Sequence, residues 1–442
     1  MRLQMLDTTA RFSCGQCTAC CDQPWRTLIE AEKTSALDAH DFGAYPQLAG
    51  KRFYRAPADG RKGFFELAKG EGTRCIFLDA DGLCIIHKEL GPQAKPNMCL
   101  QFPFLPARTW QEDRVSVNYG CSSVQQRTGR SLSEQALDIA AVVPVSNRPA
   151  RPDAPVPLDA GLRLTRDESD ALFDRAIDSF DDRHAEEIWT PFAGLLATLT
   201  SVQASKRNAG THESSGDLIE RLRSDAPLPG AEAAAEIRGF VNPAAAPMPA
   251  RFLFAATLYP DTMPADVAAG LGFWKRLALI PRLLNLATLS GGYASRLLGR
   301  NVSIGAVLAH PVEETMDPGA TALLLRYYRS RLWQRMIAGT RLPIVGGIHQ
   351  HIHDLNAILF LARAEAAAEG VSRLGEDLIS TALRRVEFHL ANQVRLHERI
   401  LRGWLRTQLC DLGLAGQSLR LMSLKRPAPV ADAAEAPADC RK

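Results

Sequence analysis

The sequence predicts a mainly α protein, in which a Cys-rich N-terminal module with a small β-hairpin precedes an all-α C-terminal region. Two observations carry this prediction. Eight of the ten cysteines lie before residue 122, and apolar residues recur at helical spacing in successive segments after residue 166. The composition agrees with a helical chain, because aromatic residues make up only 7% of it and alanine, the best helix former, is plentiful.

Length, charge and hydropathy narrow the class of protein. The chain has 442 residues, which is enough for about two or three domains. Its formal net charge of +3 is too small to predict nucleic acid binding. Residues 1–11 lack the apolar core of a secretory signal, and no run of about 18 apolar residues predicts a membrane span. We therefore expect a cytoplasmic protein with no membrane span.

The most specific stretch is the Cys-rich segment, residues 14–21, which reads C-G-Q-C-T-A-C-C. Two thiolates separated by two residues can bind one zinc ion or two corners of an iron–sulfur cluster, and this spacing occurs twice. If the segment is helical, Cys14, Cys17 and Cys21 share one face and Cys20 lies about 100° away. The adjacent pair then serves two sites, or one site and a spare position. Disulfides, the alternative, need an oxidising compartment.

The segment Cys75–His87 predicts a β-hairpin, because two apolar runs flank the turn sequence Asp-Ala-Asp-Gly. With these four residues as the turn, Cys84 lies opposite Phe77 and Cys75 lies opposite Ile86. The two thiols then share one face as diagonal neighbours, roughly 7–8 Å apart at the backbone. That spacing would let both reach one metal centre.

Two further cysteines follow the hairpin. Cys99 lies between Pro96 and Pro103, which restrict the backbone around it. Cys121 comes just after residues 115–119, whose alternating pattern predicts a strand.

Eight thiols are therefore candidate metal ligands, namely Cys14, Cys17, Cys20, Cys21, Cys75, Cys84, Cys99 and Cys121. Eight are enough for two four-ligand sites. They are also enough for one four-cysteine cluster, with the others packing or binding a second metal. The sequence leaves both divisions open.

The ordered pattern C-x-x-C-x-x-C-C, then C-I-F-L-x-x-x-G-L-C-x-I-H-K-E-L-G, then C-L-Q-F-P-F and Cys121 resembles the YkgJ-type cysteine-cluster family of zinc- or iron-chelating proteins over residues 12–125. It is also similar to the related flagellin lysine-N-methylase family, through the sequence Lys-Glu-Leu-Gly at 88–91, the strand-like run before the last cysteine and the total length. The second resemblance implies an iron–sulfur cluster, of the 4Fe-4S kind, that assists methyl transfer from S-adenosylmethionine to lysines of a protein substrate such as flagellin. Zinc is the alternative metal. The alternative function is a non-catalytic chelating protein whose helical half binds a partner.

The chain is expected to divide into four parts. Residues 1–130 form the Cys-rich module, 131–165 a Pro-rich linker, 166–424 the α-helical domain and 425–442 a disordered tail. Successive helices are predicted at Asp167–Thr200, with Thr165 as its cap, and at Arg251–Tyr259, Gly272–Leu289, Thr321–Ala338, Ile348–Ala368 and Glu376–Gln408.

Three histidines, His349, His351 and His353, lie near the start of one predicted helix. On a helix, His349 and His353 share a face and could hold zinc or iron together with Asp354. There is no Glu in the position that a metalloprotease motif requires. Polar residues at a helix start are the simpler interpretation, so metal binding here stays open. Tyr327 and Tyr328 are predicted as core residues, or as an aromatic wall for a methylsulfonium donor.

Overall fold

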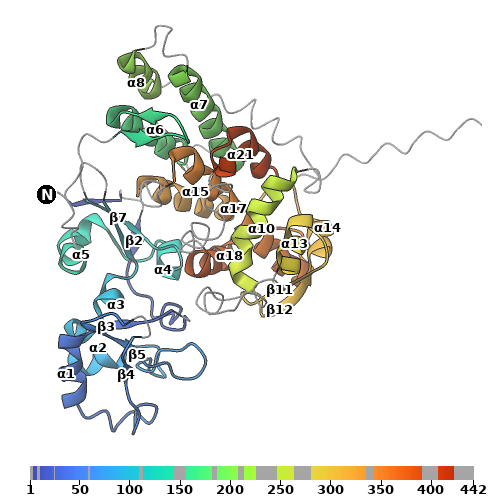
Figure 1. Ribbon diagram of the computed structural model, residues 1–442. Coiled ribbons are helices and arrows are strands. Elements are labelled where there is room, and N and C mark those ends of the chain that lie inside the picture. Colours follow the sequence, from blue (N-terminus) through green and yellow to red (C-terminus); the bar gives the residue numbers. More distant parts are fainter. Residues whose placement is uncertain are drawn as a thin grey trace, which may run out of the picture. The chain divides into compact units, whose positions relative to one another are not determined.

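The computed structural model of the chain divides into two compact units, Met1–Pro152 and Asp153–Lys442, and each is described by itself (Figure 1). The domain limits expected at residues 130, 165 and 424 stay predictions. The predicted tail lies outside the described residues, which are 3–6, 10–23, 25–57, 60–108, 113–143, 155–181, 187–207, 214–224, 246–262, 280–334, 342–390 and 407–422.

The first unit contains a small antiparallel sheet packed with two helices. Its strand order is β3-β5-β4, with bounds Leu28–Glu30, Phe64–Leu67 and Tyr54–Arg55. Helix α1, Ala31–Ala39, follows β3 directly, and α2 is Ile85–Leu90. Ile29, Leu37 and Phe77 are fully or almost fully buried in the shared core, and each such side chain contributes about 1.5–3 kcal/mol. Cys75 and Cys84 pack against this core, so the sheet fixes the position of two candidate ligands.

A second sheet in this unit has the order β1-β7-β6, with bounds Leu3–Met5, Asp113–Val117 and Phe104–Arg108. Strand β1 runs parallel to β7, and β6 runs antiparallel to it. All five residues of β7 are buried, as expected of a central strand. The strand predicted before Cys121 is therefore confirmed, two residues earlier than its pattern suggested.

The remaining elements of the first unit are short. Strands β2, Arg11–Phe12, and β8, Arg130–Ser131, pair antiparallel. The helices are α3 (Asn97–Gln101), α4 (Ser122–Gln125) and α5 (Ala136–Val142), with 3-10 turns η1 (Pro92–Ala94) and η2 (Ser133–Gln135).

The turn of the hairpin lies where it was predicted, but the predicted pairing register is wrong. The backbone N–H of Asp79 donates to the carbonyl of Leu83 at 2.9 Å, and the pairing continues with Leu78 opposite Cys84. Three residues, not two, therefore lie between the last paired positions, which shifts the register by one residue. Such a loop needs a residue with positive φ, which Gly82 supplies at φ 82°.

The prediction of a second strand after the turn is also wrong, because helix α2 begins at Ile85. Ile86 is consequently a core residue of a helix and does not pair with Cys75. Cys75 instead forms an isolated antiparallel bridge with Lys69. The two thiols thus do not become diagonal neighbours on a two-stranded ribbon.

The second unit is built mainly of helices (Figure 1). They are α6 (Arg166–Ser179), α7 (Trp189–Arg207), α8 (Ser215–Arg223), α10 (Met248–Thr262), α13 (Ile280–Thr288), α14 (Ile304–Ala309), α15 (Pro318–Trp333), α17 (Ile344–Glu369), α18 (Glu376–His389) and α21 (Leu412–Leu419). No helix in the described ranges is long and apolar enough to cross a bilayer.

Helix α17 is the centre of this unit. Its residues are buried on every face over most of its length, and it packs against α10, α14, α18 and α21. A helix that is buried on every face is enclosed by its neighbours in this way. It ends at Gly370, which adopts the left-handed conformation at φ 71° that glycine tolerates best.

The expectation of an all-α second region needs a correction, because two small hairpins interrupt the helices. Strands β9, Val156–Pro157, and β10, Arg163–Leu164, form one of them. Strands β11, Gly292–Ser295, and β12, Arg300–Ser303, form the other. The helices at 251–259, 321–333 and 348–368 are confirmed. The single helix predicted at Asp167–Thr200 is wrong, because α6 ends at Ser179 and α7 begins at Trp189, with Phe180 and Asp181 outside both. Residues 272–279 and 391–406 of two other predicted helices lie outside the description.

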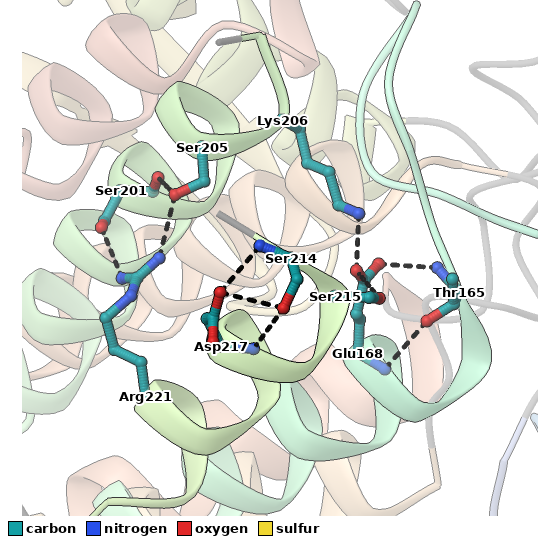
Figure 2. A network of polar contacts seen from close by, with 9 residues as sticks. All are labelled: Thr165, Glu168, Ser201, Ser205, Lys206, Ser214, Ser215, Asp217 and Arg221. Carbon is teal, nitrogen blue, oxygen red and sulfur yellow. Dashed lines mark hydrogen bonds and ion pairs between the residues drawn. The ribbon is translucent and has the colours of Figure 1, made fainter. Parts of the chain in front are cut away.

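Two helices of this unit begin with reciprocal capping boxes, which Figure 2 shows. Thr165 Oγ1 accepts from the backbone N–H of Glu168 at 3.3 Å, and a Glu168 carboxylate oxygen accepts from the N–H of Thr165 at 2.8 Å. Ser214 and Asp217 repeat the arrangement at the start of α8. Each box satisfies backbone N–H groups that a helix start leaves without partners. The cap predicted at Thr165 is confirmed.

The same Glu168 links three helices, as Figure 2 also shows. Its fully buried carboxylate accepts from Lys206 Nζ of α7 at 2.6 Å and from the Ser215 hydroxyl of α8. Burial alone would raise the pKa of Glu168, but these bonds outweigh it and the pKa is lowered. Arg221 of α8 adds a bond to Ser201 Oγ of α7 at 2.7 Å. Polar contacts therefore hold α6, α7 and α8 together beside their apolar faces.

Candidate metal centre

The Cys-rich segment is an irregular loop and not a helix. Gln16 and Thr18 both have positive φ angles, of 54° and 61°. This conformation is uncommon for residues other than glycine and costs about 1–3 kcal/mol. A turn follows, in which the N–H of Cys21 donates to the carbonyl of Thr18 at 2.8 Å. The expectation that Cys14, Cys17 and Cys21 share a helix face is therefore wrong.

The start of this loop is fixed to the segment that carries Cys121. The N–H of Gly15 donates to Ser123 Oγ at 3.1 Å, across 108 residues of sequence. Gly129 in turn lies so close to Ser13 that a Cβ atom at position 129 would overlap it. Cys121 itself is the N-cap residue of α4. These contacts hold the first cysteines beside Cys121.

The end of the loop is fixed to the segment that carries Cys75. The N–H of Cys75 donates to the carbonyl oxygen of Cys21 at 2.8 Å. Lys69 Nζ donates to the carbonyl oxygen of Gln23 at 2.9 Å, and Thr73 Oγ1 donates to a carboxylate oxygen of Asp22 at 3.0 Å. Three contacts over three successive residues thus tie this end to the loop before Cys75.

Cys84 and Cys99 are positioned by short helices. Cys84 is the N-cap residue of α2. Cys99 lies in the first turn of α3, where its N–H donates to the carbonyl of Pro96 at 2.9 Å. The proline predicted to restrict this cysteine is therefore the residue that starts its helix.

The eight thiols differ in how open they are to solvent. Cys14 and Cys17 are exposed, Cys121 is buried, and Cys20, Cys21, Cys75, Cys84 and Cys99 are half-buried. Burial raises the pKa of the Cys75 thiol to about 11, and it also raises the pKa values of Cys84, Cys99 and Cys121, because desolvation disfavours the thiolate.

The adjacent thiols Cys20 and Cys21 lie 3.8 Å apart at their sulfur atoms. The hydrogen bond that the two thiols share lowers the pKa of Cys21, and the positive charges of Lys95, Lys69 and Arg74 add to this effect, so that the pKa is about 7. The same bond raises the pKa of Cys20. The neighbouring positive charges therefore favour the thiolate form of Cys21, and a thiolate is the form that binds metal.

The sequence analysis did not predict that these three positively charged residues belong to the site. Their positions in the sequence could have indicated it, because Lys69 and Arg74 lie within six residues before Cys75, and Lys95 lies four residues before Cys99. Positive charges at such positions offset the negative charge of clustered thiolates.

The donor set fits zinc or iron in its chemistry. Thiolates are the soft ligands that both zinc and iron–sulfur clusters use, and none of the nine cysteines in the described ranges forms a disulfide. Within these ranges, however, no three Cys, His, Asp or Glu side chains already stand in metal-binding geometry. Ligation therefore needs the thiols to turn toward a common centre, which side chains on a loop and at helix starts can do.

The three histidines, His349, His351 and His353, are buried on helix α17 in the helical unit. His349 and His353 share a face as expected, with stacked rings whose centroids are 4.9 Å apart. His349 contacts the carbonyl of Leu409 at 3.2 Å and Ser418 Oγ at 2.8 Å. His351 Nδ1 lies 3.7 Å from a carboxylate oxygen of Asp354. Within the described part of the chain they do not form a metal-binding group.

The aromatic pair Tyr327 and Tyr328 belongs to the core of the helical unit. Each is 1% exposed, and their rings lie 4.7 Å apart in an edge-on arrangement. Their interpretation as core residues is confirmed. An aromatic wall for an incoming ligand would need more open rings than these.

The fold and the site together define a class: a cysteine-cluster module followed by a helical unit. Residues 13–122 match the family model named CxxCxxCC, described as a putative zinc- or iron-chelating domain. This match confirms, for residues 13–122, the resemblance to the cysteine-cluster family that their motif predicted. No curated protein and no solved structure matches the chain. The relation to flagellin lysine-N-methylase stays a prediction.

Proposed function

We propose that the first unit chelates zinc or iron through its eight N-terminal thiols. The observation that carries this proposal is the double fixation of the Cys-rich segment. The N–H of Gly15 donates to the hydroxyl of Ser123, two residues after Cys121, and the N–H of Cys75 donates to the carbonyl oxygen of Cys21. Five separate stretches of chain thus deliver thiols to one small unit, as a preorganised metal module requires.

The charges near the thiols support the same function. Four thiolates around a divalent metal leave a net negative charge on the centre. Lys69, Arg74 and Lys95 lower the pKa of Cys21, so they stabilise negative charge at this point. A cluster of thiols that served only packing would gain nothing from three neighbouring cations.

The finer function that we propose is protein lysine N-methylation supported by an iron–sulfur cluster, with S-adenosylmethionine as the donor and flagellin as the acceptor. It rests on the order of the cysteines and on the sequence Lys-Glu-Leu-Gly at 88–91. A bond would form between the neutral lysine nitrogen and the methyl carbon while the sulfonium–methyl bond breaks, which releases S-adenosylhomocysteine and a proton. A bound cluster would supply a Lewis-acidic, redox-active centre.

The first experiment is anaerobic purification of the full chain, followed by iron, sulfide and zinc analysis and an absorption spectrum. We expect bound metal in the intact chain and a clear loss in Cys17→Ser. The matched control is Cys410→Ser, because Cys410 lies in the helical unit. An intact chain that binds neither zinc nor iron would overturn the metal proposal. Iron and sulfide in near-equal amounts would support a cluster, whereas zinc without sulfide would exclude it.

A second experiment tests the methylase proposal. The metal-loaded chain is co-expressed with flagellin, and lysine methylation is read as mass shifts on flagellin peptides. Shifts that disappear in Cys17→Ser would support the enzyme. If a fully loaded chain produces no shift, the protein is instead a chelator, and its helical half becomes the candidate surface for a partner.

A further inference from the structure

The eight thiols fall into two neighbourhoods. The first, here called the outer set, contains Cys14, Cys17, Cys20 and Cys121. The bond between Gly15 and Ser123 holds this part of the loop against the start of α4.

The second neighbourhood, here called the inner set, contains Cys21, Cys75, Cys84 and Cys99. Cys21 and Cys75 are joined through their backbones at 2.8 Å, and both Cys75 and Cys84 pack against the same apolar core. The backbone N–H of Leu28, in strand β3 of the same sheet, donates to Met98 Sδ at 3.1 Å, so helix α3 places Cys99 beside this sheet. All four inner thiols are half-buried.

The two sets meet at Cys20 and Cys21. Their sulfur atoms lie 3.8 Å apart although the residues belong to different neighbourhoods. Both residues lie in the turn in which the N–H of Cys21 donates to the carbonyl of Thr18 at 2.8 Å. The pair is thus a boundary between two groups of four.

We propose that the module holds two metal centres, one bound by Cys14, Cys17, Cys20 and Cys121 and the other by Cys21, Cys75, Cys84 and Cys99. This inference rests on the proposed function, since it divides the same eight ligands. Four thiolates per centre is the coordination that both zinc and an iron–sulfur cluster accept.

The two centres differ in accessibility. Half of the outer ligands are exposed, whereas the inner ligands are half-buried and have Lys69, Arg74 and Lys95 beside Cys21. A chelator therefore reaches the outer centre first. The inner centre, whose ligands come from four of the five stretches, has the structural role, and the outer one is the centre open to exchange or to a substrate.

The test compares double variants of the full chain that remove two thiols from one set or one from each. Metal per chain is measured after dialysis against a chelator. Cys20→Ser/Cys121→Ser and Cys21→Ser/Cys99→Ser should each keep about half of the metal of the intact chain, because one four-thiolate centre survives. Cys99→Ser/Cys121→Ser should keep almost none. This expectation is the same for zinc and for iron.

Two results would separate the two proposals. If the intact chain binds metal but same-set and cross-set variants lose equal amounts, the division is wrong while chelation stands. If the intact chain binds no metal, chelation itself fails.

A second measurement uses only the intact chain, so it does not depend on whether the variants fold. The loaded chain is treated with increasing chelator and a thiol alkylating reagent, and each cysteine is followed by peptide mass spectrometry. We expect Cys14, Cys17, Cys20 and Cys121 to become labelled together, before the four inner thiols do. Labelling of all eight in a single step would overturn the division.

Discussion

Gly82 lies directly against the Cys-rich loop, because a Cβ atom at this position would come within 3.0 Å of the carbonyl oxygen of Gln16. It would also come within 3.2 Å of Thr18 Cγ2. The turn before Cys84 therefore supports the two left-handed residues of the loop. We predict that Gly82→Ala displaces this loop and lowers the metal bound after dialysis against a chelator.

The matched control is Gly72→Ala. Gly72 has a similar positive φ, of 62°, but nothing lies within 4 Å of its Cβ position. Both variants pay the same conformational cost of about 1–2 kcal/mol, and only Gly82→Ala adds a collision. Equal metal content in the two variants would show that the contact with Gln16 does not matter.

Arg331 and Glu387 form an ion pair inside the helical unit, with side-chain exposures of 5% and 1%. Tyr327 also donates to this carboxylate, at 3.1 Å. Glu387→Gln should lower the free energy of unfolding by about 3–5 kcal/mol, because it leaves the guanidinium buried without its counter-charge. Denaturant unfolding followed by circular dichroism measures this. Glu369→Gln, at an exposed position on α17, should change stability by less than about 0.5 kcal/mol.

The capping box at Thr165 gives a smaller effect that can be isolated cleanly. Thr165→Ala removes the hydroxyl that accepts from the N–H of Glu168. It should therefore lower the free energy of unfolding by about 1 kcal/mol. Thr165→Ser keeps the hydroxyl and should restore most of the loss. A serine variant as unstable as the alanine variant would mean that the methyl group, and not the cap, carries the effect.

Local patterns allowed the helical unit to be predicted. The cap at Thr165 and the apolar spacing of α15 and α17 depend on residues within a few turns of one another. The predicted register of the hairpin was wrong by one residue for a local reason as well, since the same turn sequence can form a two-residue or a three-residue loop. The short strands β11 and β12 were missed, because a four-residue strand between helices carries little periodic signal.

The arrangement of the thiols could not be predicted in the same way. It depends on contacts such as that of Gly15 with Ser123, which are 108 residues apart. It also depends on left-handed backbone at Gln16 and Thr18, and neither residue is a glycine or asparagine that would have signalled it. The cysteine spacing therefore indicated the candidate ligands, while the division that we propose for them needed the fold.

His349 makes the stability of the helical unit depend on pH. Burial is the main reason that its pKa falls from 6.5 to about 4. Between these values the unfolded chain binds a proton that the folded chain does not, so the contribution of His349 is complete above pH 6.5 and is lost as the pH falls toward 4. At 1.36 kcal/mol per pKa unit the loss amounts to about 3 kcal/mol. Carboxylates titrate in the same range, so the test compares the intact chain with His349→Gln. Unfolding free energies at pH 7 and pH 4.5 should differ by about 2–3 kcal/mol less in the variant, whereas an equal difference in both chains would mean that His349 is not the group responsible.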